Sequence, residues 1–151
     1  MNIRILSIML GFLLILSGCS ATGERFSQVN EFPKEASTLY IFRESKFFNS
    51  AYCPAMYLND EKIGCLKNGG YIRHKLQPGL HLLEVRKSAF LIGDEPKIEF
   101  FSNPGEVVFI EWTTFLNDMM VTPSVGVSAS ESLVKRSEFE ATQKLKSLNE
   151  S

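Results

Sequence analysis

The sequence predicts a mainly β protein: a small antiparallel β-sandwich of about seven strands with a C-terminal helix, preceded by a cleaved signal peptide and a flexible tether. Three observations support this prediction. The chain starts with a positive charge and a short apolar run, the layout of a signal peptide. Short apolar or alternating runs then recur between turn residues, which is typical of all-β domains. Near the C-terminus the apolar residues fall at helical spacing instead.

Residues 1–18 are predicted to be a signal peptide. Arg4 supplies positive charge, residues 5–16 are apolar, and the small residues Ser17 and Gly18 follow. The apolar run is too short to cross a bilayer, which takes about 20 apolar residues in a helix. A plain secretory signal and an N-terminal anchor helix are the alternatives.

The residues Leu16-Ser17-Gly18-Cys19 resemble the lipobox of bacterial lipoproteins. This resemblance implies that Cys19 carries lipid and becomes the first residue of the mature chain. Several acyl chains hold a protein stably on a membrane, whereas one chain binds reversibly. In a two-membrane host, Ser20 in place of Asp implies sorting to the outer membrane, with the domain facing the periplasm. We therefore expect a cell-envelope protein that reaches the membrane through its lipid.

Residues 19–37 are mostly polar and are predicted to form a lipidated tether, with packing of part of this segment on the domain as the alternative. Removing residues 1–18 from the 151-residue chain leaves 133 residues, enough for one domain. The chain has 16 basic and 17 acidic residues and no basic block. This balance argues against a nucleic-acid partner and against docking of a polybasic surface on anionic lipid, so the membrane link is expected to be the lipid.

Residues 38–127 are predicted to form the β-sandwich-like domain. Its turns are expected where Asn, Gly and Pro cluster, because Asn and Gly tolerate positive φ and Pro fits turns. Residues 128–151 are predicted to form a C-terminal helix and tail, with the helix over Glu131–Leu148 and a capping box at Ser128 and Glu131. The expected strands are residues 38–43, 52–58, 63–66, 71–76, 80–86, 97–101 and 107–115, with a further candidate at 119–122.

Two short motifs carry a family resemblance over residues 39–85. They are Tyr40-Ile41-Phe42-Arg43 and Pro78-Gly79-Leu80-His81. The stretch resembles a domain of unknown function found in many bacterial lipoproteins and other envelope proteins. The resemblance implies a small β-sandwich-like fold and brings no activity with it.

Cys53 and Cys65 flank a predicted hairpin turn at Asn59-Asp60. An exported chain meets an oxidising environment, in which two thiols can pair. Sequence spacing does not fix the Cα separation that a disulfide needs, so a disulfide and two free, partly buried thiols both remain open. We expect no metal, since two Cys and two His at these spacings do not suit a four-ligand zinc site.

Two pairs of side chains are candidates for a site. His74 and His81 would face each other across a hairpin at Gln77-Pro78, although a closed metal site needs further ligands. The alternative is that His81 bonds a neighbouring loop and His74 is exposed. Phe47 and Phe48 are adjacent in a loop, where they would contact a protein partner or plug the open end of the sandwich.

The sequence shows no nucleophile elbow and no phosphate-binding loop, so we expect no enzyme activity and no cofactor. The leading hypothesis is a non-catalytic interaction or accessory module that contacts an envelope protein. A small-ligand-binding lipoprotein, with a pocket under the Phe47 loop or at a sheet edge, is the alternative. An enzyme with a dispersed site is the third hypothesis. A deep pocket would favour the last two, whereas an exposed apolar patch or an open sheet edge would favour the first.

Overall fold

The computed structural model describes residues 20–47, 50–87, 95–120 and 126–151. In these residues it has nine strands in two sheets and one short helix near the C-terminus, so the prediction of a mainly β fold is confirmed. The elements are β1 (Ser37–Arg43), β2 (Ala55–Leu58), β3 (Glu61–Cys65), β4 (Gly70–Leu76), β5 (Gly79–Arg86), β6 (Lys97–Ser102), β7 (Val107–Met120), β8 (Gly126–Arg136), α2 (Glu138–Leu145) and β9 (Asn149–Glu150).

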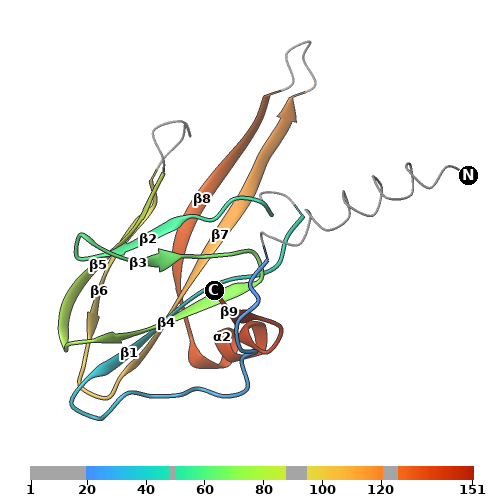
Figure 1. The fold of residues 1–151 in the computed structure, drawn as a ribbon. Helices are drawn as coiled ribbons and strands as arrows, with labels where there is room; N and C mark the ends of the chain where they lie inside the picture. Colours follow the sequence, from blue (N-terminus) through green and yellow to red (C-terminus); the bar gives the residue numbers. More distant parts are fainter. Residues whose placement is uncertain (1–19, 48–49, 88–94, 121–125) are drawn as a thin grey trace, which may run out of the picture.

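The two sheets pack face to face around the main core (Figure 1). The first sheet has the order β8-β7-β1-β4-β9 and the second has the order β3-β2-β5-β6. Strand β1 is buried at all seven positions, because it lies at the centre of the first sheet and both faces of that sheet are covered. The main core consists of Leu39, Ile41, Met56, Leu58, Leu66, Leu76, Leu83, Val85, Phe100, Val108, Ile110 and Trp112.

The first sheet is mixed, whereas the sequence predicts antiparallel strands throughout. Strand β1 pairs in parallel with β7, and β4 pairs in parallel with β9. Parallel pairs need long crossover connections, and the partners here are far apart in the sequence. The local hairpin signals in the sequence carry no information about such pairs.

Residues 131–136 belong to β8, so the predicted start of the C-terminal helix is wrong. These residues pair with β7, for example Val134 with Glu111 and Leu133 with Trp112. Helix α2 begins after Ser137, whose side chain accepts a hydrogen bond from the Glu140 backbone amide in a capping box. The pattern of Ser followed three residues later by Glu therefore recurs near the C-terminus, and the copy at Ser137 and Glu140 is the one that caps a helix.

A second core covers the outer face of the first sheet. It is formed by the outward side chains of β1, β4 and β7 together with α2 and the segment before β1. We call this segment, residues 20–36, the N-terminal strap. The members of the second core are Phe26, Tyr40, Phe42, Tyr71, Phe109, Ala141, Leu145 and Leu148.

The N-terminal strap lies where the sequence predicts a tether. Its backbone bonds to the C-terminal residues: the Gly23 amide donates to the Glu150 carbonyl at 3.0 Å, and the Phe26 amide donates to the Leu148 carbonyl at 3.0 Å. Phe26 is only 6% exposed and meets the rings of Tyr40 and Tyr71 edge-on. The strap is therefore packed on the domain, in line with the alternative that the sequence leaves open.

Strands β7 and β8 form a long hairpin that extends well past the other strands (Figure 1). Strand β7 has 14 residues, and its pairing with β1 ends at Glu111. Among the described strands, the rest of β7 pairs with β8 alone. The distal part of this hairpin, residues 116–120 and 126–129, is called the ribbon below.

Candidate functional site

His81 is a structural residue that joins two turns. It is buried, and its Nε2 lies 2.7 Å from the Gln77 carbonyl oxygen, which can only accept a hydrogen bond. The Asn59 side-chain amide lies 3.0 Å from His81 Nδ1, so Nε2 donates and Nδ1 accepts. Asn59 also holds β5, because its Oδ1 accepts from the Leu82 amide at 2.9 Å. Both ring nitrogens are thus engaged within the fold.

The expected hairpin that would bring His74 and His81 face to face is wrong. Strand β4 belongs to the first sheet and β5 to the second, so the Gln77–Gly79 corner crosses between the sheets. His74 is half-buried, and this burial lowers the pKa of its imidazole, against the opposing charge of Glu61. No group of three or more His, Cys, Asp or Glu in the described residues is arranged to hold a metal ion.

A cleft opens between the sheets next to these two histidines. Its volume is about 240 Å³, below the roughly 300–1,000 Å³ of typical small-molecule sites. Apolar and polar side chains both line it. The lining residues are Leu58, Asn59, Glu61, Ile63, His74, Lys75, Leu76, Gln77 and His81.

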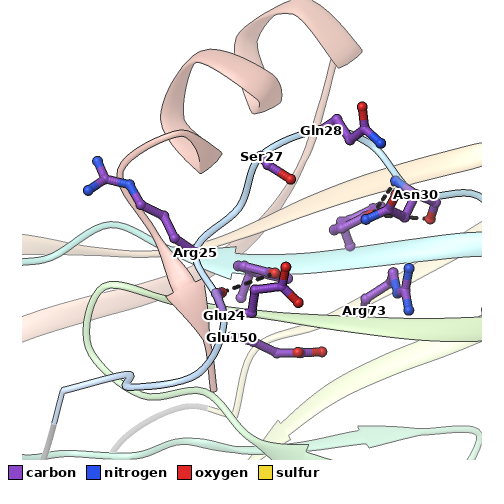
Figure 2. Close-up of a pocket in the computed structure, with 9 residues that line it drawn as sticks. Glu24, Arg25, Ser27, Gln28, Asn30, Arg73 and Glu150 are labelled. Carbon is purple, nitrogen blue, oxygen red and sulfur yellow. Dashed lines mark hydrogen bonds between the residues drawn. The ribbon is translucent and has the colours of Figure 1, made fainter.

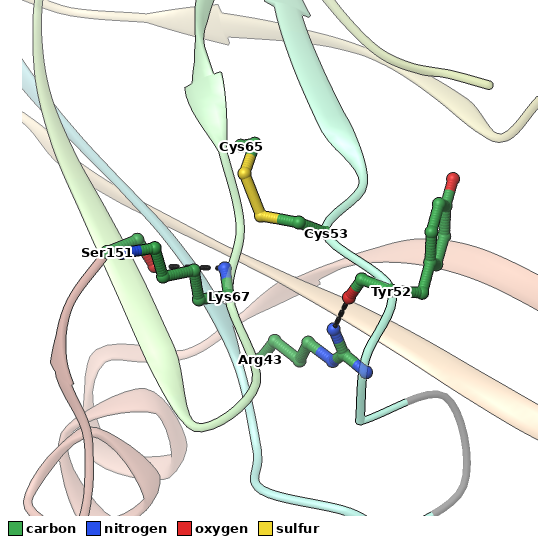
Figure 3. The surroundings of a disulfide bond; sticks show 6 residues. All are labelled: Arg43, Tyr52, Cys53, Cys65, Lys67 and Ser151. Carbon is green, nitrogen blue, oxygen red and sulfur yellow. Dashed lines mark hydrogen bonds between the residues drawn. A yellow bond between two sulfur atoms is a disulfide. The ribbon is translucent and has the colours of Figure 1, made fainter. Parts of the chain in front are cut away.

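Cys53 and Cys65 are joined in a disulfide with a Cα separation of 5.5 Å (Figure 3). The structure therefore has the first of the two arrangements that the sequence leaves open. The bond closes the open end of the β2–β3 hairpin, just beyond the pairing of Ala55 with Cys65. It ties the loop that follows β1 to the segment that leads into β4.

Arg43 lies near the disulfide (Figure 3) and holds the loop that follows β1. It is buried, donates to the Tyr52 carbonyl at 2.6 Å (Figure 3), and stacks over the Trp112 ring at 4.7 Å. Burial lowers the pKa of the Arg43 guanidinium, and Glu131 opposes this effect. Nearby, Lys87 and Glu131 form an ion pair at 3.2 Å between two buried side chains. The sandwich therefore has a charged network at this end.

Three buried polar atoms of this network have no hydrogen-bond partner within the described part of the chain. They are Tyr52 Oη, Trp112 Nε1 and Glu131 Oε2. Burial, with Glu131 adding to it, raises the pKa of the Tyr52 hydroxyl to about 12. The adjacent cavity next to Arg43 and Trp112 measures about 10 Å³, the space of one water molecule at most. The network therefore positions a loop and leaves no room for a substrate there.

The loop that Arg43 holds carries a fully exposed aromatic side chain. Phe47 is 99% exposed, so it does not plug the sandwich, and Phe48 lies outside the described residues. Asn68 fixes the base of the loop, since its Oδ1 accepts from the Lys46 amide at 3.0 Å and its Nδ2 donates to Ser45 Oγ at 3.4 Å.

Asn68 also binds the start of the N-terminal strap. Ser20 bridges to Asn68, and the Ala21 amide donates to the Asn68 carbonyl at 3.1 Å. Cys19 itself lies outside the described residues. One buried asparagine thus joins the segment that follows Cys19 to the loop that carries Phe47, a relation that the sequence does not reveal. We call this region the strap-entry end.

A shallow groove of about 50 Å³ lies where the strap crosses β4 and β9 (Figure 2). Glu24, Arg25 and Asn30 come from the strap, Arg73 from β4 and Glu150 from β9. Bonds that dock the strap border the groove, such as the 2.8 Å bond from the Asn30 amide to the Tyr40 hydroxyl. This volume holds a few water molecules and is too small for a metabolite.

The fold and these contacts define a small, disulfide-linked β-sandwich in which most of the buried polar side chains hold elements together. The family described as "Protein of unknown function (DUF2846)" matches residues 33–124, more than half of the chain. The protein therefore belongs to this family. No curated protein matches the sequence. In the part of the chain that the structure describes, no helix combines the length and apolarity needed to cross a membrane.

Proposed function

We propose that this protein is a non-catalytic interaction or accessory module of the bacterial cell envelope, anchored by lipid at Cys19 and facing the periplasm from the outer membrane. The proposal rests on two features. The lipobox-like sequence before Cys19 supports the anchor. The projecting β7–β8 ribbon supports contact with an envelope protein, and it is the observation that carries the function.

The ribbon has no other described strand beside it, and its sequence combines apolar residues with the polar residues Asn117, Asp118 and Ser128. Its register pairs Leu116 with Ala129, Met119 with Val127, and Met120 with Gly126. An isolated two-stranded ribbon is marginally stable in water. Soluble proteins usually cover or charge strands that lack a neighbour in the sheet, because the edges of such strands promote association. A partner that covers the ribbon would explain why the hairpin extends so far beyond the sheet and carries Leu116, Met119, Met120 and Val127.

Crosslinking in intact envelopes tests this function. We expect wild type to yield a specific envelope-protein product, which Met119→Ser combined with Leu116→Ser removes. The matched control is Phe101→Ser, which removes an apolar side chain that is 57% exposed on β6, away from the ribbon. Recovery of the same product from the ribbon variant, or of no product from wild type, would contradict the proposal.

The anchor has a separate test. Replacing Cys19 by Ala should abolish metabolic labelling with a fatty acid and prevent processing of the chain. Continued labelling of the Cys19→Ala protein would show that Cys19 is not the acylated residue.

The small-ligand alternative has one observation in its favour, the cleft beside His74. Its small volume argues for a compact polar ligand. A thermal-shift screen in which His74→Asn removes any stabilisation would support this alternative, and a screen without stabilising compounds would count against it.

A further inference from the structure

The chain enters the domain at its very first described residue. Ser20 bridges to Asn68, and Ala21 is already buried. The Ala21 carbonyl also accepts from Asn149 Nδ2 at 3.2 Å, so both sides of this residue are held. Consecutive Cα atoms are about 3.8 Å apart. A lipid on Cys19 would therefore leave almost no free chain between the bilayer and the fold, in contrast to the long tether that the sequence predicts.

Phe47 and two lysines lie close to this entry point along the chain. Asn68, which holds Ser20 and Ala21, also accepts a hydrogen bond from the Lys46 amide. Phe47 directly follows Lys46 and therefore lies close to the entry point. Lys67 directly precedes Asn68, and its amide donates to Ser151 Oγ at 3.2 Å (Figure 3). Lys46 Nζ donates to the Thr114 carbonyl at 3.3 Å. Among the described residues, neither Lys46 nor Lys67 forms an ion pair, whereas the neighbouring Glu44 is paired with Lys144 at 3.0 Å. Lys46, Phe47 and Lys67 are called the entry surface below.

An exposed aromatic ring beside lysines is the chemistry of the membrane interface. Aromatic rings settle at the headgroup level, and lysines near the surface attract anionic lipids. The Phe47 ring is almost fully exposed although Asn68 and Arg43 hold its loop in place, so the fold presents this apolar side chain to the outside. A surface next to an acylated residue meets the bilayer before it meets any other partner.

We propose that the entry surface rests on the headgroup region of the same bilayer that holds the anchor, with Phe47 inserted. The domain then sits flush on the membrane in one orientation, and the β7–β8 ribbon is held at a fixed angle to it. This inference rests on the proposed lipid at Cys19. It gives Phe47 a lipid contact in place of the protein contact predicted from the sequence.

The test uses the full acylated chain reconstituted into phosphatidylcholine vesicles that contain phosphatidylglycerol. Phe47→Trp places a reporter on the entry surface. Phe101→Trp places a matched reporter on β6. Phe101 pairs with Leu80 at the start of β5, at the opposite end of the sandwich from Arg43. Trp112 is buried, is the only tryptophan of wild type and is common to both variants, so it provides a constant background.

Brominated lipids quench only tryptophans that enter the bilayer. We expect the added Trp at position 47 to lose roughly half of its emission or more, as befits an aromatic ring at headgroup depth, and the one at position 101 to be unchanged. The combination of Lys46→Glu and Lys67→Glu should weaken this quenching in anionic vesicles and leave it nearly unchanged in neutral ones.

The outcomes separate the two proposals. Mass spectrometry of the same sample reports whether Cys19 carries lipid, and an unmodified Cys19 overturns both the anchor and the docking. An acylated chain with no quenching at position 47, or with equal quenching at positions 47 and 101, overturns the docking alone. Quenching that appears only when an envelope extract is added would assign Phe47 to a protein partner instead.

Discussion

Replacing Phe26 by Ala distinguishes a packed N-terminal strap from a tether. Phe26 is 6% exposed, and its ring centroid lies 5.9 Å from that of Tyr40 and 5.8 Å from that of Tyr71. Truncating a buried Phe costs about 3–5 kcal/mol, and an edge-on aromatic pair contributes about 0.5–1.5 kcal/mol beyond its buried area. Because the strap has solvent on its outer side, we expect the low end of this range, about 3 kcal/mol.

Urea unfolding followed by the fluorescence of Trp112 measures this change in the free energy of unfolding. Trp112 is the only tryptophan of the chain and is buried in the main core. Hydrogen exchange at the amides of Ala21, Gly23 and Phe26 gives a local measure, because each of these amides donates to the backbone of the domain. If the strap detaches before global unfolding, exchange at these amides will accelerate more than the global stability falls.

Phe139→Ala is the matched control. Its side chain is 74% exposed on α2, so the loss should stay within about 0.5 kcal/mol, as for most surface substitutions. If Phe26→Ala is equally mild and the strap amides exchange at the rate of an unfolded peptide, residues 20–36 are a tether. The flush docking of the domain would then be wrong as well.

Three further predictions concern the two ends of the sandwich. Replacing both Cys53 and Cys65 by Ser removes a disulfide between residues 12 apart in the sequence. The free energy of unfolding in urea should fall by about 3 kcal/mol, because the unfolded chain is no longer constrained by the closed loop; an unchanged midpoint would mean that the thiols are not paired. Tyr52→Phe should leave stability unchanged or raise it by up to about 1 kcal/mol, because the hydroxyl is buried with no described partner. The pKa of Tyr52 is about 12 when folded and about 10 when unfolded, so wild type should also lose stability as the pH rises above 10, and the variant should lose less. The pKa of His74 is lowered, so the unfolded state binds its proton first and stability should fall as the pH drops below about 6.5; His74→Asn should flatten this pH dependence, and an unaltered slope would refute the assignment.

The strands up to residue 115 could be predicted because local turn chemistry marks their ends. Asn59 and Asp60 both adopt positive φ, 49° and 69°, in the two-residue turn between β2 and β3. Gly79 has φ 142° at the corner between β4 and β5, a conformation that side chains disfavour. These requirements depend on a few adjacent residues, so they are visible in the sequence.

The rest depends on contacts between distant segments. The Ser128 to Glu131 pattern looks like a helix cap, but pairing with β7 places these residues in a strand. The sequence also does not reveal that the Gln77–Gly79 corner changes sheets, so the two histidines lie on different sheets and not opposite each other in a hairpin, although both line the same cleft. In each case tertiary pairing overrides the local signal.

The candidate site was only partly predictable for the same reason. Phe47 and the two cysteines stand out by residue type. Asn68 does not, although its side chain and backbone join the strap to the Phe47 loop. Glu111 was missed as well: it is a buried carboxylate that bonds Arg136 and Lys144, each at 2.7 Å, and thereby attaches β8 and α2 to β7.

The Tyr40-Ile41-Phe42-Arg43 run of β1 shows how one strand contacts both the N-terminal strap and the loop that carries Phe47. Because side chains alternate along a strand, Ile41 enters the main core while Tyr40 and Phe42 enter the second core. The Tyr40 hydroxyl then bonds the strap at Asn30, and Arg43 holds the loop at Tyr52. Two residues of this run, Tyr40 and Arg43, therefore fix the strap and the loop that carries Phe47. Substitutions at Tyr40 or Arg43 should therefore lower stability and loosen the strap or the Phe47 loop, and, if the domain docks on the bilayer as proposed, they should also reduce the quenching of a tryptophan at position 47.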